Sequence, residues 1–404
     1  MINIAILGFG VVGSGVLEII NEHADDLIGK TGDKLNVKYI LDIRDFSGHP
    51  MAEKFTKNYD EILNDPEVLV VAEVIGGTDP AYTYTKRALE AGKHVVTSNK
   101  ELVAKKGTEL LKIAKEHGVS YMFEASVGGG IPIIRPLNQC LAANSITEIM
   151  GILNGTTNYI LTSMIKKGRS FDEALKKAQD LGYAERNPEA DVEGIDACRK
   201  VAILASLITG KEVDCSKIYT EGITKITLED VTSAERLGFV IKLIGYIQVC
   251  GSRVFARVSP LLLERSNPLA NVEDVFNGIL VVGDSTGEVM FYGKGAGKRP
   301  TASAVVADII DIAENKPAGK FMWVKNDDPS FMIDISESSS QFFMRVKNLS
   351  EDKAEEIFGK ILTAPDSDEE ELAFITREMG EKEFEKKKEL VGYGNIISCI
   401  RVHR

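Results

Sequence analysis

Four charged residues in the middle of the chain have the types and spacing that proton transfer on a polar substrate requires. They are Glu185, Asp191, Asp196 and Lys200, in the stretch LGYAERNPEADVEGIDACRKVAILASL. Asp196 and Lys200 are four residues apart, so a helix would place them on one face. Residues Val201–Ile208 are apolar on almost every face, which predicts a buried helix. A lysine at the entrance to such a helix needs a partner or a shifted pKa, and either condition suits proton transfer.

Isolated pairs with this spacing are usually structural ion pairs, so the surrounding elements must decide the role of this one. Ser170 and Glu173 form a capping-box pattern that opens an amphipathic helix, and Gly182 is suited to end it. Asp191 then has the position of a cap for the helix that carries the pair. We expect that helix to run to about residue 209, with Gly210 as its stop.

The start of the chain has the pattern of a dinucleotide-binding turn. An apolar strand predicted at Ile2–Leu7 leads directly into GFGVVG and then into a helix predicted over residues 14–23. Gly8 allows the tight turn, Gly10 lets the backbone approach a pyrophosphate, and Gly13 lets helix and strand pack closely. The helix N-terminus adds free N–H groups and a favourable dipole for phosphates. The context predicts a dinucleotide site in preference to a purely structural turn.

The residues leave the choice between NAD and NADP open. Beyond a strand predicted at Val37–Leu41, an acid such as Asp42 would bind a ribose 2′-hydroxyl, whereas Arg44 could meet a 2′-phosphate. A solvated loop is the other interpretation of these charges.

Three further strands continue the alternating βαβ pattern. The strands predicted at residues 68–75 and 94–97 are followed directly by GGT and by SNK. Gly77 and Lys100 therefore lie at the carboxyl ends of these strands, where ligands bind in an open parallel sheet. A strand predicted at residues 121–125 ends beside a triple glycine. Its carbonyls and Glu124 could form an oxygen cage for a hard cation, although the residues alone favour a flexible connector.

The pattern changes after about Ile133. Strands predicted at residues 146–153, 254–258, 278–282 and 288–292, mixed with helices, indicate an α+β domain with a largely antiparallel sheet. A long apolar helix at Thr301–Ala313 follows the loop GKGAG, and we expect it to pack back against the first domain. Glu314–Gly319 is predicted to be a linker. In the charged final part we predict strands at residues 341–346, 371–376 and 396–402 and helices at 350–362 and 381–390.

Composition narrows the class of protein. The 404 residues are 44% hydrophobic and 27% charged, which is typical of a globular protein with two or three domains. We expect no membrane helix and no signal peptide. The net charge of −12 argues against nucleic acid as a partner. Five scattered cysteines without C-x-x-C spacing indicate reduced thiols in the cytoplasm and argue against a zinc site.

Six blocks of sequence, in one order and spacing, resemble homoserine dehydrogenase over nearly all of residues 1–314. They are GFGVVGSGV, TSNKELVA, EASVGGGIPII, GILNGTTNYIL, LGYAERNPEADVEGIDACRKVAIL and YGKGAGKRPTASAVVADI. The resemblance implies NAD(P)H-dependent reduction of L-aspartate 4-semialdehyde to L-homoserine, on the route to threonine and methionine. It also implies a Rossmann-type domain at residues 1–132 completed by helix 301–314, and a catalytic and dimerisation domain at 133–300. A homodimer and a C-terminal ACT-like α+β domain at 320–404, which could bind an amino-acid effector, complete the expected α/β architecture.

The resemblance assigns roles to matching positions. Lys200 matches the catalytic lysine, and Asp196 matches the acid that orients it. Glu185, Asp191 and Asp196 match the substrate-binding side, and Lys100 lies beside nicotinamide and substrate. The dinucleotide contacts are expected at Gly8, Phe9, Gly10, Val11, Val12, Gly13, Arg44, Gly77, Lys100 and Gly297. A site for a monovalent cation such as sodium is expected at Glu124, Val127, Gly129 and Ile131.

Two other functions are weighed against this one. An aldehyde dehydrogenase needs a cysteine nucleophile near a histidine, and no cysteine here has a glycine-rich or strand-end setting. A catalytically silent NAD(P)-binding sensor would be expected to lack the carboxylate–lysine set, which this chain retains.

Overall fold

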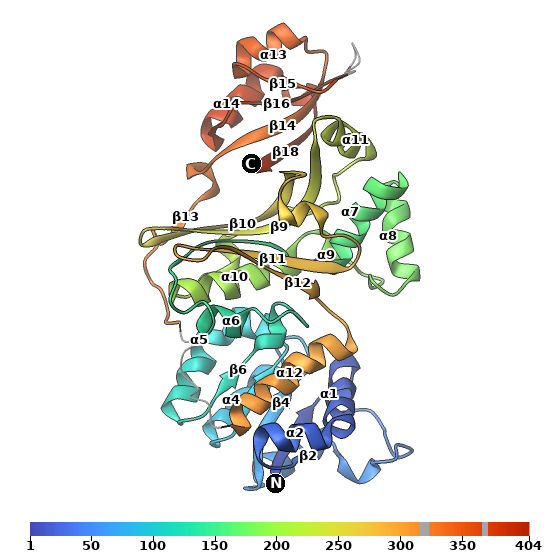
Figure 1. Ribbon diagram of the computed structural model, residues 1–404, viewed down its shortest axis with the longest axis vertical. Helices are drawn as coiled ribbons and strands as arrows, with labels where there is room; N and C mark the ends of the chain where they lie inside the picture. The colour runs from blue at the N-terminus through green and yellow to red at the C-terminus, as the bar shows by residue number, and fades with distance from the viewer. Residues whose placement is uncertain (315–322, 366–370, 404) are drawn as a thin grey trace. The chain divides into compact units, whose positions relative to one another are not determined.

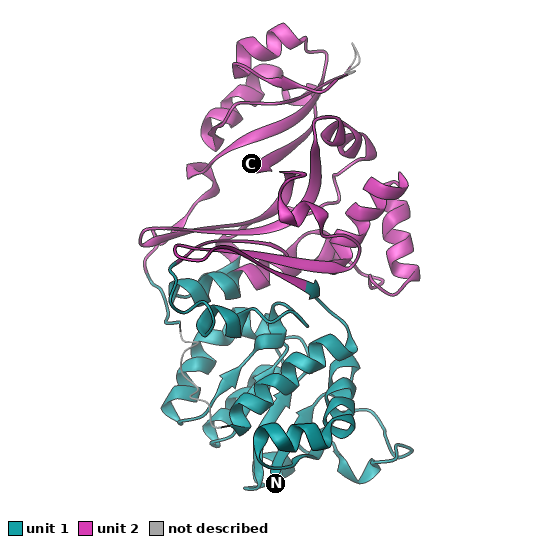
Figure 2. Cartoon of the chain, in the orientation of Figure 1, with its two compact units in different colours: residues 1–145, 202–215, 293–327 teal, residues 146–201, 216–292, 328–404 magenta. Residues whose placement is uncertain are grey.

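The structure is a computed structural model that describes residues 1–404 except 315–322, 366–370 and 404. The chain forms two compact units, each assembled from separate segments (Figure 2). Unit 1 comprises residues 1–145, 202–215 and 293–327, and unit 2 comprises residues 146–201, 216–292 and 328–404. The linker predicted at 314–319 lies almost wholly outside the described residues. Among the described residues, no helix combines the length and the apolarity needed to cross a bilayer.

Unit 1 is built on a six-stranded parallel sheet with the order β3-β2-β1-β4-β5-β6. The strands are β1 (Ile2–Leu7), β2 (Leu35–Leu41), β3 (Phe55–Thr56), β4 (Val68–Glu73), β5 (His94–Thr97) and β6 (Tyr121–Met122). Its main helices are α1 (Val11–Glu22), α2 (Ala24–Thr31), α3 (Tyr59–Leu63), α4 (Ala81–Glu90), α5 (Lys100–Glu116), α6 (Ile134–Asn138) and α12 (Lys298–Ala313). The strand order reverses between β1 and β4, the point where such sheets bind ligands. The Rossmann-type prediction is confirmed.

Helix α12 joins unit 1 although it begins about 160 residues after the end of α6 in the chain. Its buried Ala302, Val305 and Ile309 belong to the same apolar cluster as Val16 of α1 and Ile4 of β1. Figure 1 shows α12 running beside α1. At the crossing, a Cβ on Gly15 would lie 2.9 Å from the Ala302 Cβ, so only glycine lets the two helices approach this closely. The apolar pattern predicted this packing.

Unit 2 contains a twelve-stranded mixed sheet whose main path is β12-β11-β7-β9-β10-β18-β14-β16-β15. The strands on this path are β7 (Ile146–Ile152), β9 (Phe239–Cys250), β10 (Arg253–Glu264), β11 (Phe276–Gly283), β12 (Gly287–Lys294), β14 (Ser339–Lys347), β15 (Leu362–Thr363), β16 (Glu371–Ile375) and β18 (Ile396–His403). Three short strands, β8 (Tyr219–Thr220), β13 (Met332–Ile333) and β17 (Met379–Gly380), pair beside it. Pairing within β11-β7-β9-β10 is antiparallel, as the sequence predicts.

Seven α-helices of the described chain belong wholly or partly to unit 2, and four of them follow β7 in succession. They are α7 (Gly155–Lys167), α8 (Phe171–Asp180), α9 (Glu189–Val192), the first residues of α10 (Ile195–Thr209), α11 (Leu228–Arg236), α13 (Glu351–Phe358) and α14 (Glu381–Val391). The C-terminal strands and helices begin within a few residues of their predicted positions (Figure 1). The helix predicted at 350–362 is too long, because α13 ends at Phe358 and Leu362–Thr363 forms strand β15. Their grouping as an ACT-like domain stays a prediction.

Two further sequence predictions are wrong in detail, and one long strand was missed. Asp191 does not cap the long helix, because it lies inside the separate short helix α9 and α10 begins only at Ile195. The strand predicted to reach residue 125 ends at Met122, and Glu124–Ser126 forms a 3-10 turn instead. Strand β9 was not predicted at all, because its run FVIKLIGYIQVC is apolar without a strand's alternation.

Candidate active site

The predicted acid–lysine pair lies at the start of α10 in unit 2. Lys200 Nζ is 2.9 Å from Asp196 Oδ2, and the two side chains are only 8% and 5% exposed. The same ammonium donates a 2.6 Å hydrogen bond to the carbonyl oxygen of Leu153, directly after β7. Two acceptors on different elements therefore fix the position of Nζ, and the predicted pairing is confirmed.

Asn154 connects the carboxylates around this lysine. Its Nδ2 donates to Asp191 Oδ1 at 2.7 Å and to Asp196 Oδ2 at 3.0 Å. The two amide protons of one side chain thus hold two carboxylates that would otherwise repel each other. Asn154 was not among the predicted site residues. The signal was present, because an asparagine directly before G-T-T at a helix start is a typical cap.

The backbone around Asn154 explains why the sequence there is N-G-T-T. Asn154 Oδ1 accepts from the Thr157 N–H at 2.9 Å and caps α7. A Cβ on Gly155 would lie 2.7 Å from the Val275 carbonyl oxygen, so the position excludes larger residues. Thr156 Oγ1 donates to the Tyr183 carbonyl at 2.6 Å and ties down the segment that follows α8.

The remaining predicted substrate residues are placed differently. Asp191 is half-buried in α9 and joins the cluster through Asn154. Glu185 is exposed, two residues beyond Tyr183, and among the described residues its carboxylate makes no hydrogen bond or ion pair to the cluster. Asp191 and Asp196 thus bring two acidic side chains, which are negatively charged when ionised, to one cluster. A substrate with an ammonium group would complement that charge.

The glycine turn in unit 1 has the tight backbone geometry that the sequence predicts. Gly8 has a φ of +96°, and a Cβ on Gly13 would lie 2.0 Å from the Gly8 carbonyl oxygen, so both positions require glycine. A Cβ on Gly10 would meet no atom within 4 Å, which leaves the space before α1 open. Val11, the first residue of α1, is 65% exposed although it is apolar. Open backbone and an exposed apolar side chain at a helix N-terminus fit a pyrophosphate and its riboses.

Asp42 and Arg44 fold back onto this turn. Asp42 Oδ2 accepts from the Phe9 N–H at 2.7 Å, and Arg44 donates both to Asp42 and to the Phe9 carbonyl oxygen at 2.8 Å. The hydrogen bonds from the Arg44 side chain hold the pKa of Asp42 well below its usual range. Asp42 therefore stays ionised, and Arg44 is 57% exposed and accessible to a phosphate.

Lys100 is the first residue of α5, at the carboxyl end of β5. Asn99 caps this helix by accepting from the Leu102 N–H, and its Nδ2 donates to the Gly77 carbonyl at 2.6 Å. The predicted residues Gly77 and Lys100 are thus linked by Asn99, which the sequence analysis did not select. Beneath them, burial raises the pKa of Glu73, which accepts from Thr97 at 2.7 Å.

The predicted cation segment is a tight turn in unit 1. The Glu124 carboxylate is buried and accepts from the backbone N–H groups of Ile133, Ile134 and Arg135 at 2.7 to 2.9 Å, so its side chain is committed to capping α6. Within the described part of the chain, no hydrogen bond ends on the carbonyl oxygens of Val127, Gly129 or Ile131. Three such carbonyls are suitable ligands for a hard monovalent cation.

The loop before α12 lies against this turn. A Cβ on Gly129 would lie 2.2 Å from the Gly295 carbonyl oxygen, so the two glycine segments are in contact. Gly297, with a φ of +120°, is the residue before α12. All ten predicted dinucleotide contacts and all four predicted cation ligands therefore belong to unit 1, whereas the carboxylate–lysine cluster belongs to unit 2.

Two family models match the chain. A family model described as "Homoserine dehydrogenase, NAD binding domain" matches residues 8–124, and one described as "Homoserine dehydrogenase" matches residues 132–310. A homoserine dehydrogenase of Bacillus subtilis is 47% identical over 323 residues, which are 79% of this chain and 74% of that protein.

Two solved structures extend the similarity. A crystal structure of a homoserine dehydrogenase from Thiobacillus denitrificans has a TM-score of 0.92 at 35% identity, and the match covers 100% of this chain and 98% of that one. A hyperthermophilic archaeal homoserine dehydrogenase in complex with NADPH has a TM-score of 0.67 at 31% identity, covering 78% of this chain and 99% of that one.

Proposed function

Since the chain belongs to the homoserine dehydrogenase family of NAD(P)-dependent oxidoreductases, which act on a CH–OH group, we propose that Lys200 is its proton donor. The reaction is the reduction of L-aspartate 4-semialdehyde to L-homoserine, in amino-acid biosynthesis. The observation that carries the proposal is the position of Lys200, buried and held by Asp196 and the Leu153 carbonyl. A lysine fixed in this way is oriented before the substrate arrives.

A bound nicotinamide dinucleotide supplies the hydride, which reduces the aldehyde carbon. The Lys200 ammonium donates a proton to the carbonyl oxygen as negative charge develops on it, and the alcohol results. Asp196 stabilises the ammonium before transfer, and solvent returns the proton afterwards. Lys100 provides a second positive charge that stabilises the developing oxyanion. Asp191 and Glu185 bind the ammonium group of the substrate.

The proton-donor role is tested by replacing Lys200 with methionine, which keeps its length and removes the charge. We expect kcat in the Lys200→Met enzyme to fall by roughly 10²- to 10⁴-fold, the usual contribution of a general acid. Absorbance of the reduced nicotinamide, with homoserine plus NAD or NADP, follows the reaction. A Lys200→Met enzyme that stays folded with near-normal kcat would contradict the assignment.

Lys242 supplies a matched control for this test. It is also a buried lysine of unit 2, but its Nζ donates to Asn158 Oδ1 and to the Val272 carbonyl, away from the cluster. Lys242→Met should therefore change stability and leave kcat unchanged. If Lys100→Met abolishes turnover while Lys200→Met does not, the two roles are exchanged.

We propose that the dinucleotide contacts are the unit 1 residues predicted from the sequence, with Asp42 and Arg44 deciding between NAD and NADP. We also propose a sodium site formed by the carbonyls of Val127, Gly129 and Ile131 beside Glu124. The unoccupied hydrogen-bonding capacity of those carbonyls supports it. Replacing sodium by tetramethylammonium at constant ionic strength should lower activity, and unchanged kinetics would exclude the site.

Three further features of the family resemblance are proposed for this chain. They are a homodimer, an amino-acid effector bound by the C-terminal ACT-like part, and a cytoplasmic location. The free thiols of all five cysteines support a reducing compartment. Sedimentation of the full chain, alone and with amino acids, tests the first two.

A further inference from the structure

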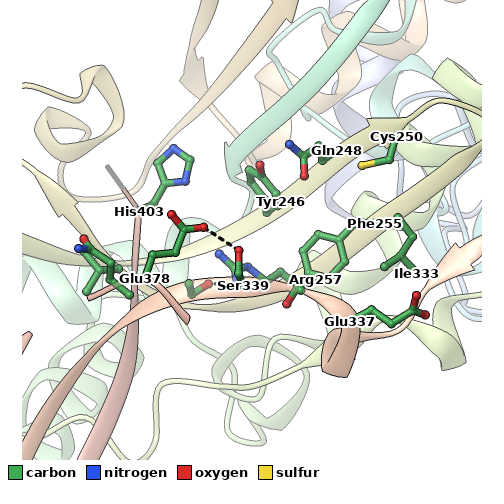
Figure 3. Close-up of a pocket in the computed structure, with 14 residues that line it drawn as sticks. Tyr246, Gln248, Cys250, Phe255, Arg257, Ile333, Glu337, Ser339, Glu378 and His403 are labelled. Carbon is green, nitrogen blue, oxygen red and sulfur yellow. Dashed lines mark hydrogen bonds between the residues drawn. The ribbon is translucent and has the colours of Figure 1, made fainter. Parts of the chain in front are cut away.

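A cavity of about 530 Å³ opens within unit 2, on the sheet face shared by the β9–β10 hairpin and the C-terminal strands β14 and β18 (Figure 3). The hairpin contributes Tyr246, Phe255 and Arg257, and the C-terminal part contributes Ser340, Glu378 and His403. None of these residues belongs to the carboxylate–lysine cluster. A volume of this size is typical of sites for small molecules.

Arg257 makes this cavity chemically unusual. It is only 4% exposed, and its guanidinium lies over the rings of Tyr246 and Phe255, at 5.3 and 5.8 Å from their centres. Its one hydrogen bond among the described residues is from Nη1 to Ser340 Oγ at 3.3 Å, and its Nε is buried without a partner. Burial, assisted by the charge of Arg401, lowers the pKa of Arg257 to about 10.

Two other largely covered arginines of unit 2 show what Arg257 lacks. Arg401 pairs with Glu381 and Glu221, at 2.5 and 3.3 Å. Arg345 pairs with Asp230 and Glu371, at 2.8 and 2.7 Å. Each has two carboxylate partners, whereas Arg257 has none among the described residues. A buried guanidinium without an anion is costly, so a carboxylate from outside the chain would complete it.

The other polar groups of the cavity restrict what else the ligand carries. Glu337 is already paired with Arg253 at 3.1 Å. His403 is kept neutral, because burial and the nearby Arg257 lower its pKa. Glu378 is exposed and accepts a 2.6 Å hydrogen bond from Ser339 Oγ (Figure 3), so its carboxylate remains as an acceptor for a hydroxyl or ammonium group.

We infer that this cavity binds a small carboxylic acid that also carries a hydroxyl or ammonium group, with its carboxylate on Arg257 and its donor toward Glu378. The inference rests on the effector proposal above and gives that effector a site. A ligand in the cavity can affect the position of Lys200 through the strands of a single sheet. Tyr246 of β9 pairs with Met150 of β7, three residues before the Leu153 carbonyl that holds Lys200.

Calorimetric titration of the full chain without dinucleotide tests the site. The probes are L-serine and L-lactate, with ethanolamine as the analogue that lacks a carboxylate and sodium chloride at matched ionic strength. We expect saturable binding of both acids and none of ethanolamine or chloride. Arg257→Gln should weaken binding at least tenfold. Arg265→Gln, directly after the same strand, exposed, and outside the cavity together with its partner Glu235, should leave it unchanged.

A second variant keeps the test interpretable if the Arg257→Gln protein does not fold. Glu378→Gln is a surface change, and it should weaken L-serine at least fivefold while L-lactate binds as before. Equal binding in the Arg257→Gln protein, no saturable binding of either acid, or chloride binding as well as the acids would overturn the inference. Homoserine oxidation is measured in parallel on each variant. Loss of acid binding in Arg257→Gln with full homoserine oxidation is the expected result. A wild-type protein that oxidises homoserine fully but binds neither acid rejects only the cavity, whereas a wild-type protein that binds both acids but does not oxidise homoserine rejects only the proposed function.

Discussion

Replacing Asn154 by aspartate should damage catalysis out of proportion to its effect on the fold. The change is isosteric, and aspartate caps a helix as well as asparagine does, so the hydrogen bond from the Thr157 N–H is retained. The two bonds that Nδ2 donates to Asp191 and Asp196 are lost. A third carboxylate then stands within about 3 Å of the other two.

The magnitude follows from the two lost bonds and the added charge. Hydrogen bonds to charged groups contribute about 1.5–3 kcal/mol each, and like charges about 4 Å apart repel by about 4 kcal/mol at an effective dielectric constant of 20. The cluster reduces this cost by retaining a proton. Asp196 then holds Lys200 less firmly, and we expect kcat at neutral pH to fall roughly 100-fold, or about 2.7 kcal/mol. The acidic limb of the kcat profile should move toward neutral pH.

The assay measures kcat and KM from pH 5 to 9 by nicotinamide absorbance, with thermal unfolding of the same samples. Asn58→Asp is the matched control. Asn58 caps the surface helix α3 through the same kind of bond, from the Asp60 N–H, so the chemical change is identical and lies outside the cluster. It should leave both kcat and the pH profile unchanged.

The reasoning fails if Asn154→Asp keeps kcat within twofold of the parent with the same pH profile. It also fails if kcat falls only in parallel with the folded fraction. Asn154→Ala separates the effect of losing the helix cap from the effect of adding a carboxylate. It should lower the free energy of unfolding by about 1 kcal/mol, and it should shift the acidic limb of the kcat profile less than Asn154→Asp does.

Two more predictions concern other charged residues of the fold. Burial lowers the pKa of Lys242 from 10.5 to about 8, so the unfolded chain binds more protons between these values and stability should rise with pH across that window. At about 1.4 kcal/mol per pKa unit, the free energy of unfolding of the wild type should rise by about 3 kcal/mol relative to Lys242→Met. Urea unfolding of both proteins at pH 7.5 and 10.5 measures this difference. If the free energy of unfolding changes equally with pH in both proteins, Lys242 is not desolvated. In the dinucleotide site, Arg44→Gln should raise KM for NADP roughly tenfold, about 1.4 kcal/mol, and leave KM for NAD within twofold. Equal changes for both cofactors would mean that Arg44 only supports Asp42.

The sequence predicted those parts of the fold and site that depend on local chemistry. The glycine turn, the Ser170–Glu173 capping box and the pairing of Asp196 with Lys200 all depend on residues within a few positions of each other. The structure confirms each of them. Asp191 was misplaced because a short helix intervenes, and an acid near a helix start has the same signature in either helix.

Residues that act over long sequence distances were missed. Asn154 is 37 and 42 residues from the carboxylates that it holds, and Arg257 is 83 residues from Ser340. Neither has a local pattern that reveals its partner. Arg257 in particular alternates with apolar residues on a strand and resembles an ordinary solvent-facing position until the paired strands bury it.

The late position of α12 in the chain has a consequence for synthesis. The face of unit 1 that Ala302, Val305 and Ile309 cover is complete by residue 145, yet α12 begins only at Lys298. At about 5–20 residues per second, the ribosome needs roughly 10–30 s to deliver it. During that interval the nascent sheet exposes apolar surface, and Arg135 lacks its partners Asp308 and Asp311. Such an intermediate should bind holdase chaperones, and truncation before α12 should leave an aggregation-prone polypeptide.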